Sequence, residues 1–293
     1  MLPKEFTPEY LSQLELLRVH ARRAFLGRKQ GGHVSLKRGH GIEFSDYRQY
    51  ELGDSPRHID WGVYGRTDKL FVKRFREEQD LNLALILDCS SSMSVPELYS
   101  KWGMAKSIAL SLAYVALLEQ DSVCLYCLGL SQSPTFYGVR AIHSIAKILN
   151  QTQAAAGQNF AADLQQAASR LRFPGVAVVL SDFLAPLDQI ERGFNMLRAK
   201  NMDISAIQIL SPDDLDPPGD LSNAFAVDSE TGEQLSLRLN EQDRKEYAEA
   251  LVEHNENLKL YFSAARISHS LAFSNKPAGD FVLGTLTQIG LLR

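Results

Sequence analysis

The fold of this chain is decided by residues 83–92, which read LALILDCSSS. The first five residues are a continuous apolar run, as expected of a strand that is buried on both faces of a parallel sheet. After the run come Asp88, Ser90 and Ser92, which place one carboxylate and two hydroxyls on a short loop. Oxygen ligands of this kind suit Mg²⁺, Mn²⁺ or Ca²⁺. Taken alone, however, the pattern favours a plainer role in which Asp88 or Ser90 caps the next helix.

A second apolar run, VAVVL at residues 176–180, ends in a serine followed by Asp182. Parallel sheets bind ligands beyond the carboxyl ends of their strands, at the point where the strand order reverses. If the two strands are neighbours there, Asp88 and Asp182 face one crevice. Two carboxylates would repel each other in that crevice unless a cation lay between them. The two strands together therefore predict a divalent-cation site formed by Asp88, Ser90, Ser92 and Asp182.

These residues resemble the metal-ion-dependent adhesion site of von Willebrand factor A domains, with the pattern Asp88-x-Ser90-x-Ser92 and Asp182. An upstream block is more specific and resembles the domain-of-unknown-function 58 family: Gly39-x-Gly41-x-Glu43-Phe44, Arg48-x-Tyr50, Gly53-Asp54 and Arg57-x-Ile59-Asp60-Trp61. This second resemblance extends over nearly the whole chain. It implies a doubly wound, mostly parallel α/β sheet of von Willebrand factor A type, with an N-terminal helix and a small β extension packed on it.

The resemblance also implies a fifth metal ligand, normally a threonine on a loop between the two aspartate strands. Asn159 takes that position in this chain, just before the helix expected over residues 161–171. Its amide oxygen can coordinate a hard cation, and it can equally cap the helix with no metal present. We therefore expect Mg²⁺ or Mn²⁺, bound weakly because of Asn159, at a site made of Asp88, Ser90, Ser92, Asn159 and Asp182.

Strand and helix patterns alternate from residue 81 onward, which indicates a parallel sheet. Strands are expected at 81–87, 123–128, 135–139, 176–180, 204–210 and 269–273, and helices at 97–119, 141–150, 161–171, 187–199, 241–265 and 281–292. A hairpin is expected at 224–227 and 234–237. We expect residues 1–78 to contribute an N-terminal helix, a basic loop and a small β extension, and residues 79–293 to form the α/β domain.

The N-terminal helix is expected to start at Thr7 and to carry an apolar stripe as far as Gly27. Residues 108–118 are apolar around the whole helix circumference, so another element should cover their outer side, and the N-terminal helix is the obvious one. Residues 39–61 either build a ligand pocket or, as we favour, hold a small β unit together through pairs between arginine and aspartate. No chemistry is assigned there to Glu43, Arg48, Asp54, Arg57 or Asp60.

Composition indicates an ordinary soluble protein, with 45% hydrophobic and 23% charged residues and a net charge of −4. The longest nearly apolar stretch, 108–118, is too short for a membrane span, which needs roughly 20 residues. The first 16 residues lack the apolar core of a signal peptide, so we expect a cytoplasmic protein. Cys124 and Cys127 have the redox spacing, but in a strand they point to opposite faces and are expected to be buried thiols.

Three function classes follow, and the first is a non-enzymatic, metal-dependent protein-interaction module whose partner supplies an acidic residue. The family resemblance implies that this partner is a MoxR-type AAA+ ATPase acting in protein assembly or maturation. The second class is nucleic-acid binding through the basic stretch 16–42, which is unlikely because Phe25 is its only aromatic residue. The third is a hydrolase with Ser90 as nucleophile, which would need a base, and no histidine lies near a strand end that faces the crevice.

Overall fold

The computed structural model describes residues 2–21, 42–77, 81–95, 100–130, 134–153, 159–171, 175–216, 225–227, 234–236 and 241–293. Contacts between residues divide the chain into two compact units. The larger unit contains Met1–Ala24 and Leu81–Arg293, and the smaller unit contains Phe25–Asp80. The N-terminal helix therefore groups with the sheet, and the second boundary lies two residues from the expected one at residue 78.

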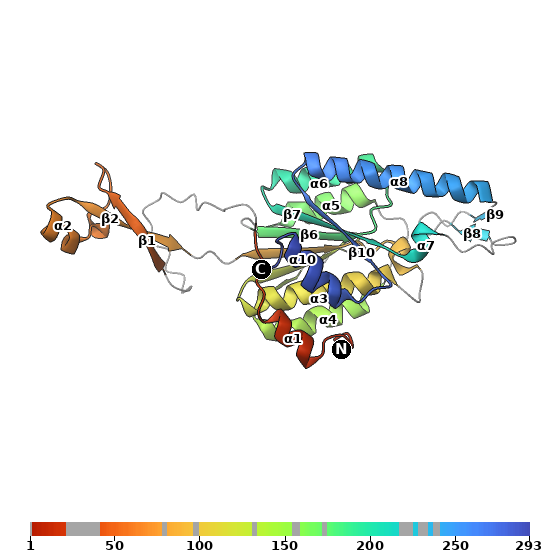
Figure 1. Ribbon diagram of the computed structural model, residues 1–293, viewed down its shortest axis with the longest axis horizontal. Helices are drawn as coiled ribbons and strands as arrows, with labels where there is room; N and C mark the ends of the chain where they lie inside the picture. The colour runs from red at the N-terminus through yellow and green to blue at the C-terminus, as the bar shows by residue number, and fades with distance from the viewer. Residues whose placement is uncertain are drawn as a thin grey trace. The chain divides into compact units, whose positions relative to one another are not determined.

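The larger unit is built on a six-stranded sheet with the strand order β10-β7-β6-β3-β4-β5 (Figure 1). Its strands are β3 (Asn82–Leu87), β4 (Ser122–Cys127), β5 (Thr135–Phe136), β6 (Gly175–Ser181), β7 (Asp203–Leu210) and β10 (Ser268–Phe273). All neighbouring strands run parallel except β4 and β5. The sequence prediction of a mostly parallel α/β sheet is thus confirmed, and each of the six expected strands is present.

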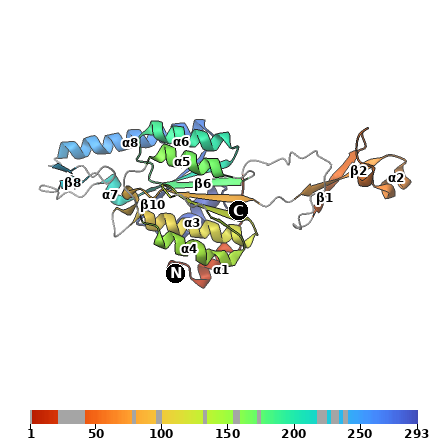
Figure 2. The same ribbon diagram turned by 180° about the vertical axis from the view of Figure 1, so that it is seen from behind.

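Both faces of the sheet are covered by helices, as Figures 1 and 2 show from opposite sides. One face carries α3 (Lys101–Leu118) and α4 (Ile142–Gln151), and the other carries α5 (Phe160–Arg170), α6 (Leu187–Ala199) and α8 (Glu241–Ala264). Side chains of β3 alternate between the two cores, with Leu83, Leu85 and Leu87 on the α3 side and Ala84 and Ile86 on the α5 side. Burial on both faces explains why the strand sequences are continuously apolar.

The strand order reverses between β3 and β6. The chain passes from β3 to β4 on one side and then crosses to β6 on the other side of β3. In the parallel register Leu87 lies beside Leu180, so Asp88 and Ser181 follow at the same level of the sheet edge. This is the switch point at which open α/β sheets bind their ligands.

The outer side of α3 is covered by α1 (Pro8–Leu14), as the sequence predicted. Leu14 is fully buried, and the Tyr10 hydroxyl lies 2.9 Å from the Ser111 hydroxyl. Because Ser111 donates its own hydrogen to the Ser107 carbonyl, Tyr10 is the donor of this bond. The expected extension of the helix to Gly27 is wrong, since α1 ends at Leu14 and residues 22–27 lie outside the described residues.

The chain beyond α1 pairs with the C-terminus instead of continuing as a helix. Val19 forms an antiparallel bridge with Leu292, and the Arg18 amide donates to the Arg293 carbonyl at 2.7 Å. The helix expected over 281–292 is present with other bounds, because its turns run from residue 278 to residue 288 and are not all of α type. A short α-turn (Ala278–Asp280), a π-helix (Phe281–Thr285) and a last turn, α10 (Leu286–Gln288), are followed by Gly290 at φ +75°. Glycine at positive φ ends the helix and releases the last residues for this pairing.

The smaller unit contains an antiparallel pair, β1 (Ile42–Gln49) and β2 (Phe71–Glu77), together with the helix α2 (Trp61–Thr67). The sequence prediction of strands and turns missed α2, which carries two glycines and no apolar stripe. Arg48 pairs with Asp54 at 2.6 Å, and the Asp60 carboxylate caps α2 by accepting from the amides of residues 62 and 63. These contacts support the structural interpretation of the block. Arg57 is exposed, and the side chain of Glu43 lies outside the described residues.

The hairpin and the two buried cysteines agree with the sequence prediction, which did not include the short helix after β7. The hairpin consists of β8 (Phe225–Val227) and β9 (Gln234–Ser236), and its connecting residues lie outside the described part of the chain. A short helix, α7 (Pro212–Leu215), follows β7. Cys124 and Cys127 are buried in the two opposite cores of the sheet. Of the helices that the structure describes, none combines the length and the hydropathy required to cross a membrane.

Candidate functional site at the carboxyl edge of strands β3 and β6

Asp88 follows β3 directly and is 4% exposed. Its backbone amide donates to the Leu180 carbonyl at 2.9 Å, which extends the pairing of β3 with β6 by one residue. The two carboxylate oxygens accept different bonds: Oδ1 from the Ser90 amide at 2.8 Å and Oδ2 from the Ser181 hydroxyl at 2.6 Å. The carboxylate is therefore held rigidly at the switch point by both strands.

Ser90 and Ser92 form a hydroxyl pair beside Asp88. Their Oγ atoms lie 3.0 Å apart, and both residues are only partly buried. Ser92 belongs to a short 3₁₀ turn, η2 (Ser91–Ser94), which brings the alternate serines to the same side of the loop. The structure thus joins three of the expected site residues in one contiguous group of oxygen atoms.

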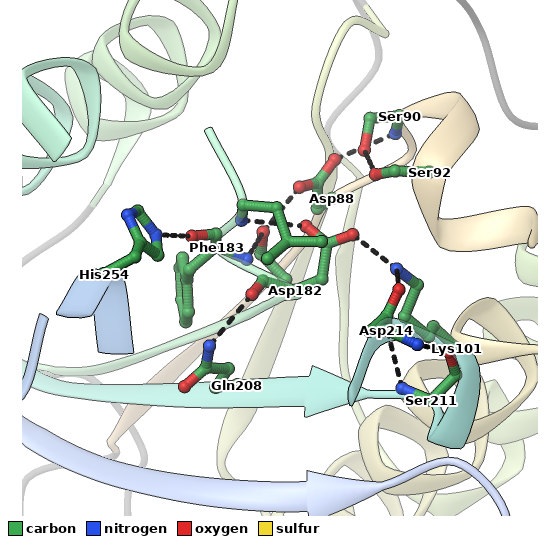
Figure 3. Close-up of polar contacts among 12 residues, drawn as sticks. Asp88, Ser90, Ser92, Lys101, Asp182, Phe183, Gln208, Ser211, Asp214 and His254 are labelled. Atoms are coloured by element: carbon green, nitrogen blue, oxygen red, sulfur yellow. Dashed lines mark hydrogen bonds and ion pairs between the residues drawn. The ribbon is translucent and has the colours of Figure 1, made fainter. Parts of the chain in front are cut away.

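Asp182 follows β6 and is bound by a buried lysine. Lys101, the first residue of α3, is 1% exposed, and its Nζ lies 2.8 Å from Asp182 Oδ2 and 3.1 Å from Asp214 Oδ1. In Figure 3, Ser90 and Ser92 lie beside Asp88, and Lys101 lies beside Asp182 and Asp214. Burial acts to lower the pKa of Lys101, but the charges of the two carboxylates outweigh it and raise that pKa above its ordinary value. The lysine is therefore a permanent cation in the site.

The backbone after Asp182 is held in an unusual conformation. Phe183 has φ +52°, in the left-handed region that a bulky side chain rarely adopts. Its amide donates to the Ser181 hydroxyl at 2.9 Å, and its carbonyl lies 2.7 Å from His254 Nε2, which must be the donor. The ring is fully buried and lies 5.6 Å from the Phe262 ring, centre to centre. Packing and hydrogen bonding together keep Asp182 turned toward the site.

A hydrogen-bonded group centred on Gln208 holds the backbone of Asp182. Gln208 on β7 donates from Nε2 to the Asp182 carbonyl at 3.2 Å and to Asn255 Oδ1 at 2.8 Å. Its Oε1 accepts from His269 Nε2 at 3.2 Å. Burial, with a smaller effect of the Lys259 charge, lowers the pKa of His269 to about 4, so this histidine is neutral at physiological pH. It acts as a hydrogen-bond donor in the support of the site.

The donor set fits a divalent cation in charge and in ligand type. The Lys101 ammonium contacts two carboxylates, those of Asp182 and Asp214, and Asp88 adds a third carboxylate at the same sheet edge, so negative charge is in excess by two. Burial and the neighbouring Asp182 charge raise the pKa of Asp88 to about 6, although hydrogen bonds from Ser181 and Ser90 lower it. Among the described residues, no three side chains of histidine, cysteine or acid type gather into a metal-binding group. A cation here would therefore depend on the serine hydroxyls for the rest of its ligands.

Asn159 has a different partner in the structure. Its Oδ1 accepts from the Ala162 amide at 2.9 Å and caps α5. This was the alternative that the sequence left open beside metal coordination. An amide oxygen has a second lone pair, so the cap does not by itself exclude a ligand role. Asp88, Ser90, Ser92 and Asp182 thus lie at the switch point, whereas Asn159 bonds to the N-terminus of α5.

A family model described as "Protein of unknown function DUF58" matches residues 46–257. The chain belongs to this family. The match contains Asp88, Ser90, Ser92, Asn159 and Asp182 together with Lys101 and Asp214, but it does not reach His269, α1 or the C-terminal segment 278–293. An uncharacterized Mycobacterium tuberculosis protein, Rv1480, is 26% identical over 262 residues, which cover 84% of this DUF58 chain and 79% of the relative. An uncharacterized Mycobacterium avium protein, MAV169, is 33% identical over 96 residues, covering 31% and 55% of the two chains.

Two solved structures are similar to this DUF58 chain at low identity. A conserved hypothetical protein BatB from Bacteroides thetaiotaomicron gives a TM-score of 0.44 at 16% identity and covers 71% of this chain and 98% of its own. An aerotolerance-related membrane protein from Bacteroides fragilis gives a TM-score of 0.41 at 18% identity, covering 71% and 97%.

Lys101, Asp214 and Ser181 are site residues of this DUF58 protein that the sequence reasoning missed. One feature of the sequence could have identified Lys101 as a site residue. It occupies the first turn of a helix whose next 17 residues are nearly all apolar, and a cation there is disfavoured by the helix dipole. A lysine in that position needs an acidic partner, which Asp182 and Asp214 provide. Nothing in the sequence distinguishes Asp214, because the polar stretch around it contains three other aspartates, at 213, 216 and 220.

Replacing Asp88 by asparagine is expected to stabilise the protein at neutral pH. The pKa of this carboxyl is about 6 in the folded protein, above its ordinary value of 3.8. Its contribution to stability is thus greatest in acid and is lost as pH rises through 6, because the folded state then holds a buried charge. Asparagine stays neutral, so the gain should grow from near zero at pH 4 to at most about 3 kcal/mol at pH 8.

The measurement is chemical denaturation of both proteins between pH 4 and pH 8, without divalent ions. Asp213→Asn, at an exposed position in α7, is the matched control and should show no such pH-dependent gain. Asparagine can keep both hydrogen bonds of Asp88, since the Ser181 hydroxyl is able to accept as well as donate. If the difference in free energy of unfolding between Asp88→Asn and the unaltered protein does not change with pH, the buried charge of Asp88 is not its cause.

Proposed function

We propose that this chain is a non-catalytic protein-interaction module that binds an acidic side chain of a partner protein at the site of Asp88, Ser90, Ser92 and Asp182. The observation that carries the proposal is the pair of buried carboxylates at the ends of two adjacent parallel strands, with a pair of half-buried hydroxyls beside them. Such a group has excess negative charge and several oxygen atoms able to act as ligands, a combination that suits a cation shared with an incoming acid.

The strand order supports a von Willebrand factor A-like fold as the finer description. In order of appearance the strands of the sheet are arranged 3-2-1-4-5-6, and the short edge strand β5 is antiparallel. The site follows the first and fourth of these strands, where such a domain would carry its adhesion site. This agrees with the resemblance seen in the sequence pattern Asp88-x-Ser90-x-Ser92.

Mg²⁺ or Mn²⁺ is the cation we assign to the site. Ser90 and Ser92 would hold it through their hydroxyls, and Asp88 and Asp182 would do so directly or through water. When bound, the ion would balance the excess negative charge and offer a coordination position to a carboxylate of the partner. The residues of this chain fix the hydroxyls and carboxylates in place, and Lys101 limits the negative charge on Asp182.

A MoxR-type AAA+ ATPase is the partner that the family resemblance suggests. We propose that the module links such an ATPase to assembly or maturation of other proteins. The excess of negative charge makes the bare site repel acidic groups, so capture of an acidic partner should require the cation.

The double substitution Ser90→Ala and Ser92→Ala is expected to weaken Mn²⁺ binding at least tenfold and to abolish capture of a MoxR-type ATPase. Both hydroxyls would be direct ligands, while both side chains lie on a loop outside the core, so the fold should be kept. Mn²⁺ binding is measured by electron paramagnetic resonance of the full chain, and capture by pull-down with and without EDTA.

The matched control is Ser12→Ala with Ser169→Ala, two exposed serines on α1 and α5 whose hydroxyls bond only to their own helices. This control should bind Mn²⁺ and the ATPase as the unaltered chain does. If capture persists in EDTA and in the Ser90 and Ser92 variant, the proposed site is not the interaction surface. The basic stretch 16–42 would then be tested next.

A further inference from the structure

A cavity of about 490 Å³ lies beside the first turns of α3, in the larger unit. Its walls come from the N-terminal residues 2–5, from α3, from the last turn of α4 and from the segment that follows β10. Leu2, Met104 and Ala278 supply an apolar part of the lining. The volume is in the range of pockets that hold small molecules.

Three lysines border this cavity: Lys4, Lys106 and Lys276. Within the part of the chain that the structure describes, none of them forms an ion pair. The ammonium groups of Lys106 and Lys276 lie 5.9 Å from the Trp102 ring centre and 5.5 Å from the Phe273 ring centre. Burial lowers the pKa of Lys106, as expected when no anion is present to offset the loss of water. Glu5 is the only acid among the lining residues.

Ser274 lines the same cavity, and its hydroxyl lies unsatisfied just beneath the cavity surface. Its Oγ is buried and has no hydrogen-bond partner among the described residues. A buried hydroxyl left without a partner is unfavourable, so its presence calls for an explanation, and a bound ligand supplies one. A hydroxyl donates readily to a phosphate or carboxylate oxygen.

The start of α3 favours an anion at this position as well. Ser100 and Gly103 line the cavity, and α3 runs from there for 18 residues, so the positive end of its dipole lies at the cavity wall. Lys101 does not take part, because its ammonium is bound to Asp182 and Asp214. The cavity and the carboxylate site thus use different side chains of the same helix.

We propose that this cavity binds a small phosphorylated molecule, with its phosphate held by Lys4, Lys106, Lys276 and the Ser274 hydroxyl. The three ammonium groups match the charge of a phosphate monoester or diphosphate, and the apolar wall fits the organic part of the ligand. The proposal is independent of the metal-dependent interaction described above, since none of its residues belongs to that site.

Tryptophan fluorescence offers a direct test in the full chain. The chain has two tryptophans, Trp61 and Trp102, so Trp61→Phe leaves Trp102 as the only reporter. Pyrophosphate, inorganic phosphate and ADP are titrated at constant ionic strength, with chloride as the reference anion. We expect saturable changes in Trp102 emission, because an anion that attracts Lys106 alters its contact with the ring.

The double substitution Lys106→Gln and Lys276→Gln should weaken pyrophosphate binding at least tenfold. Lys200→Gln with Lys245→Gln removes the same charge from exposed positions and should leave binding unchanged. Ser274→Ala separates binding from folding: it should weaken binding severalfold while stability stays equal or rises, because an unsatisfied buried hydroxyl is removed.

Three results would overturn the assignment. The first is the absence of a saturable change in fluorescence with pyrophosphate, phosphate and ADP. The second is pyrophosphate binding by the Lys106 and Lys276 variant as tight as by the unaltered chain. The third is tighter binding of hexaglutamate than of ADP and pyrophosphate. The last result would identify the cavity as a site for an acidic peptide instead.

Discussion

Replacing Lys101 by methionine is expected to lower the free energy of unfolding by about 3–5 kcal/mol, because it leaves two buried carboxylates without their cation. The Lys101 ammonium is 2.8 Å from Asp182 and 3.1 Å from Asp214, and its side chain is 2% exposed. Methionine fills nearly the same volume, so the loss reports the charge and not a cavity. Urea denaturation at pH 7.5 without divalent ions measures the effect.

A second substitution should rescue most of this loss. In the Lys101→Met protein, Asp182→Asn removes the charge that Lys101 neutralised, and we expect it to recover at least half of the lost free energy. Lys200→Met, at an exposed position at the end of α6, is the control and should change stability by less than about 0.5 kcal/mol. If Lys101→Met is as mild as this control, the ion pair contributes nothing to the fold.

The same variant also tests the proposed cation site. Lys101 binds the Asp182 oxygen that a metal ion would use, so Lys101→Met should bind Mn²⁺ more tightly than the unaltered protein does. Mn²⁺ should then restore stability in proportion to its occupancy. Destabilisation without any gain in Mn²⁺ affinity would uphold the ion pair and argue against metal ligation by Asp182.

A protein that begins at Leu81 is expected to aggregate, because the outer side of α3 then becomes exposed. Residues 2–21 cover that side through Tyr10 and Leu14 and through the pairing of Val19 with Leu292. Loss of one large buried side chain costs about 2–5 kcal/mol, so the loss of the whole segment exceeds the stability of an ordinary domain. Size-exclusion chromatography and thermal denaturation measure the outcome.

The matched control keeps residues 1–24 and replaces residues 25–80 by a long Gly/Ser linker. This protein should stay monomeric and unfold cooperatively, since residues 1–24 and 81–293 form one compact unit. A soluble, monomeric and cooperatively folded protein beginning at Leu81 would show that the cover on α3 is dispensable.

The sheet could be predicted from the sequence because its strands carry two independent signals. Residues 83–87 and 176–180 are continuous apolar runs, which burial on both faces requires, and each is followed by polar residues at the sheet edge. The location of Asp88, Ser90 and Ser92 at the sheet edge could be predicted in the same way, because they follow one of these strands. Parallel strands put their carboxyl ends at one edge, so neighbouring strands suffice to bring Asp88 near Asp182.

Features that depend on tertiary contacts could not be predicted in this way. The left-handed conformation of Phe183 leaves no trace in the sequence, since glycine is the residue that normally indicates a positive φ. The apolar stripe that suggested a helix as far as Gly27 is real, but residues 18–20 pair with 291–293 as extended chain. Here a partner at the other end of the chain outweighs local periodicity.

The pairing of the two chain ends also determines when folding can finish. Val19 is synthesised long before its partner Leu292, which lies 292 − 19 = 273 residues further along the chain. Phe281, Val282 and Leu286 pack into the same core as α3, so part of the α3 surface stays uncovered until these residues have been synthesised. Closing a loop that spans almost the entire chain is slow, and the incomplete intermediate exposes apolar surface meanwhile. The fold therefore cannot be completed before residues 281–292 have been synthesised, and a nascent chain stalled before residue 281 would depend on chaperones to stay soluble.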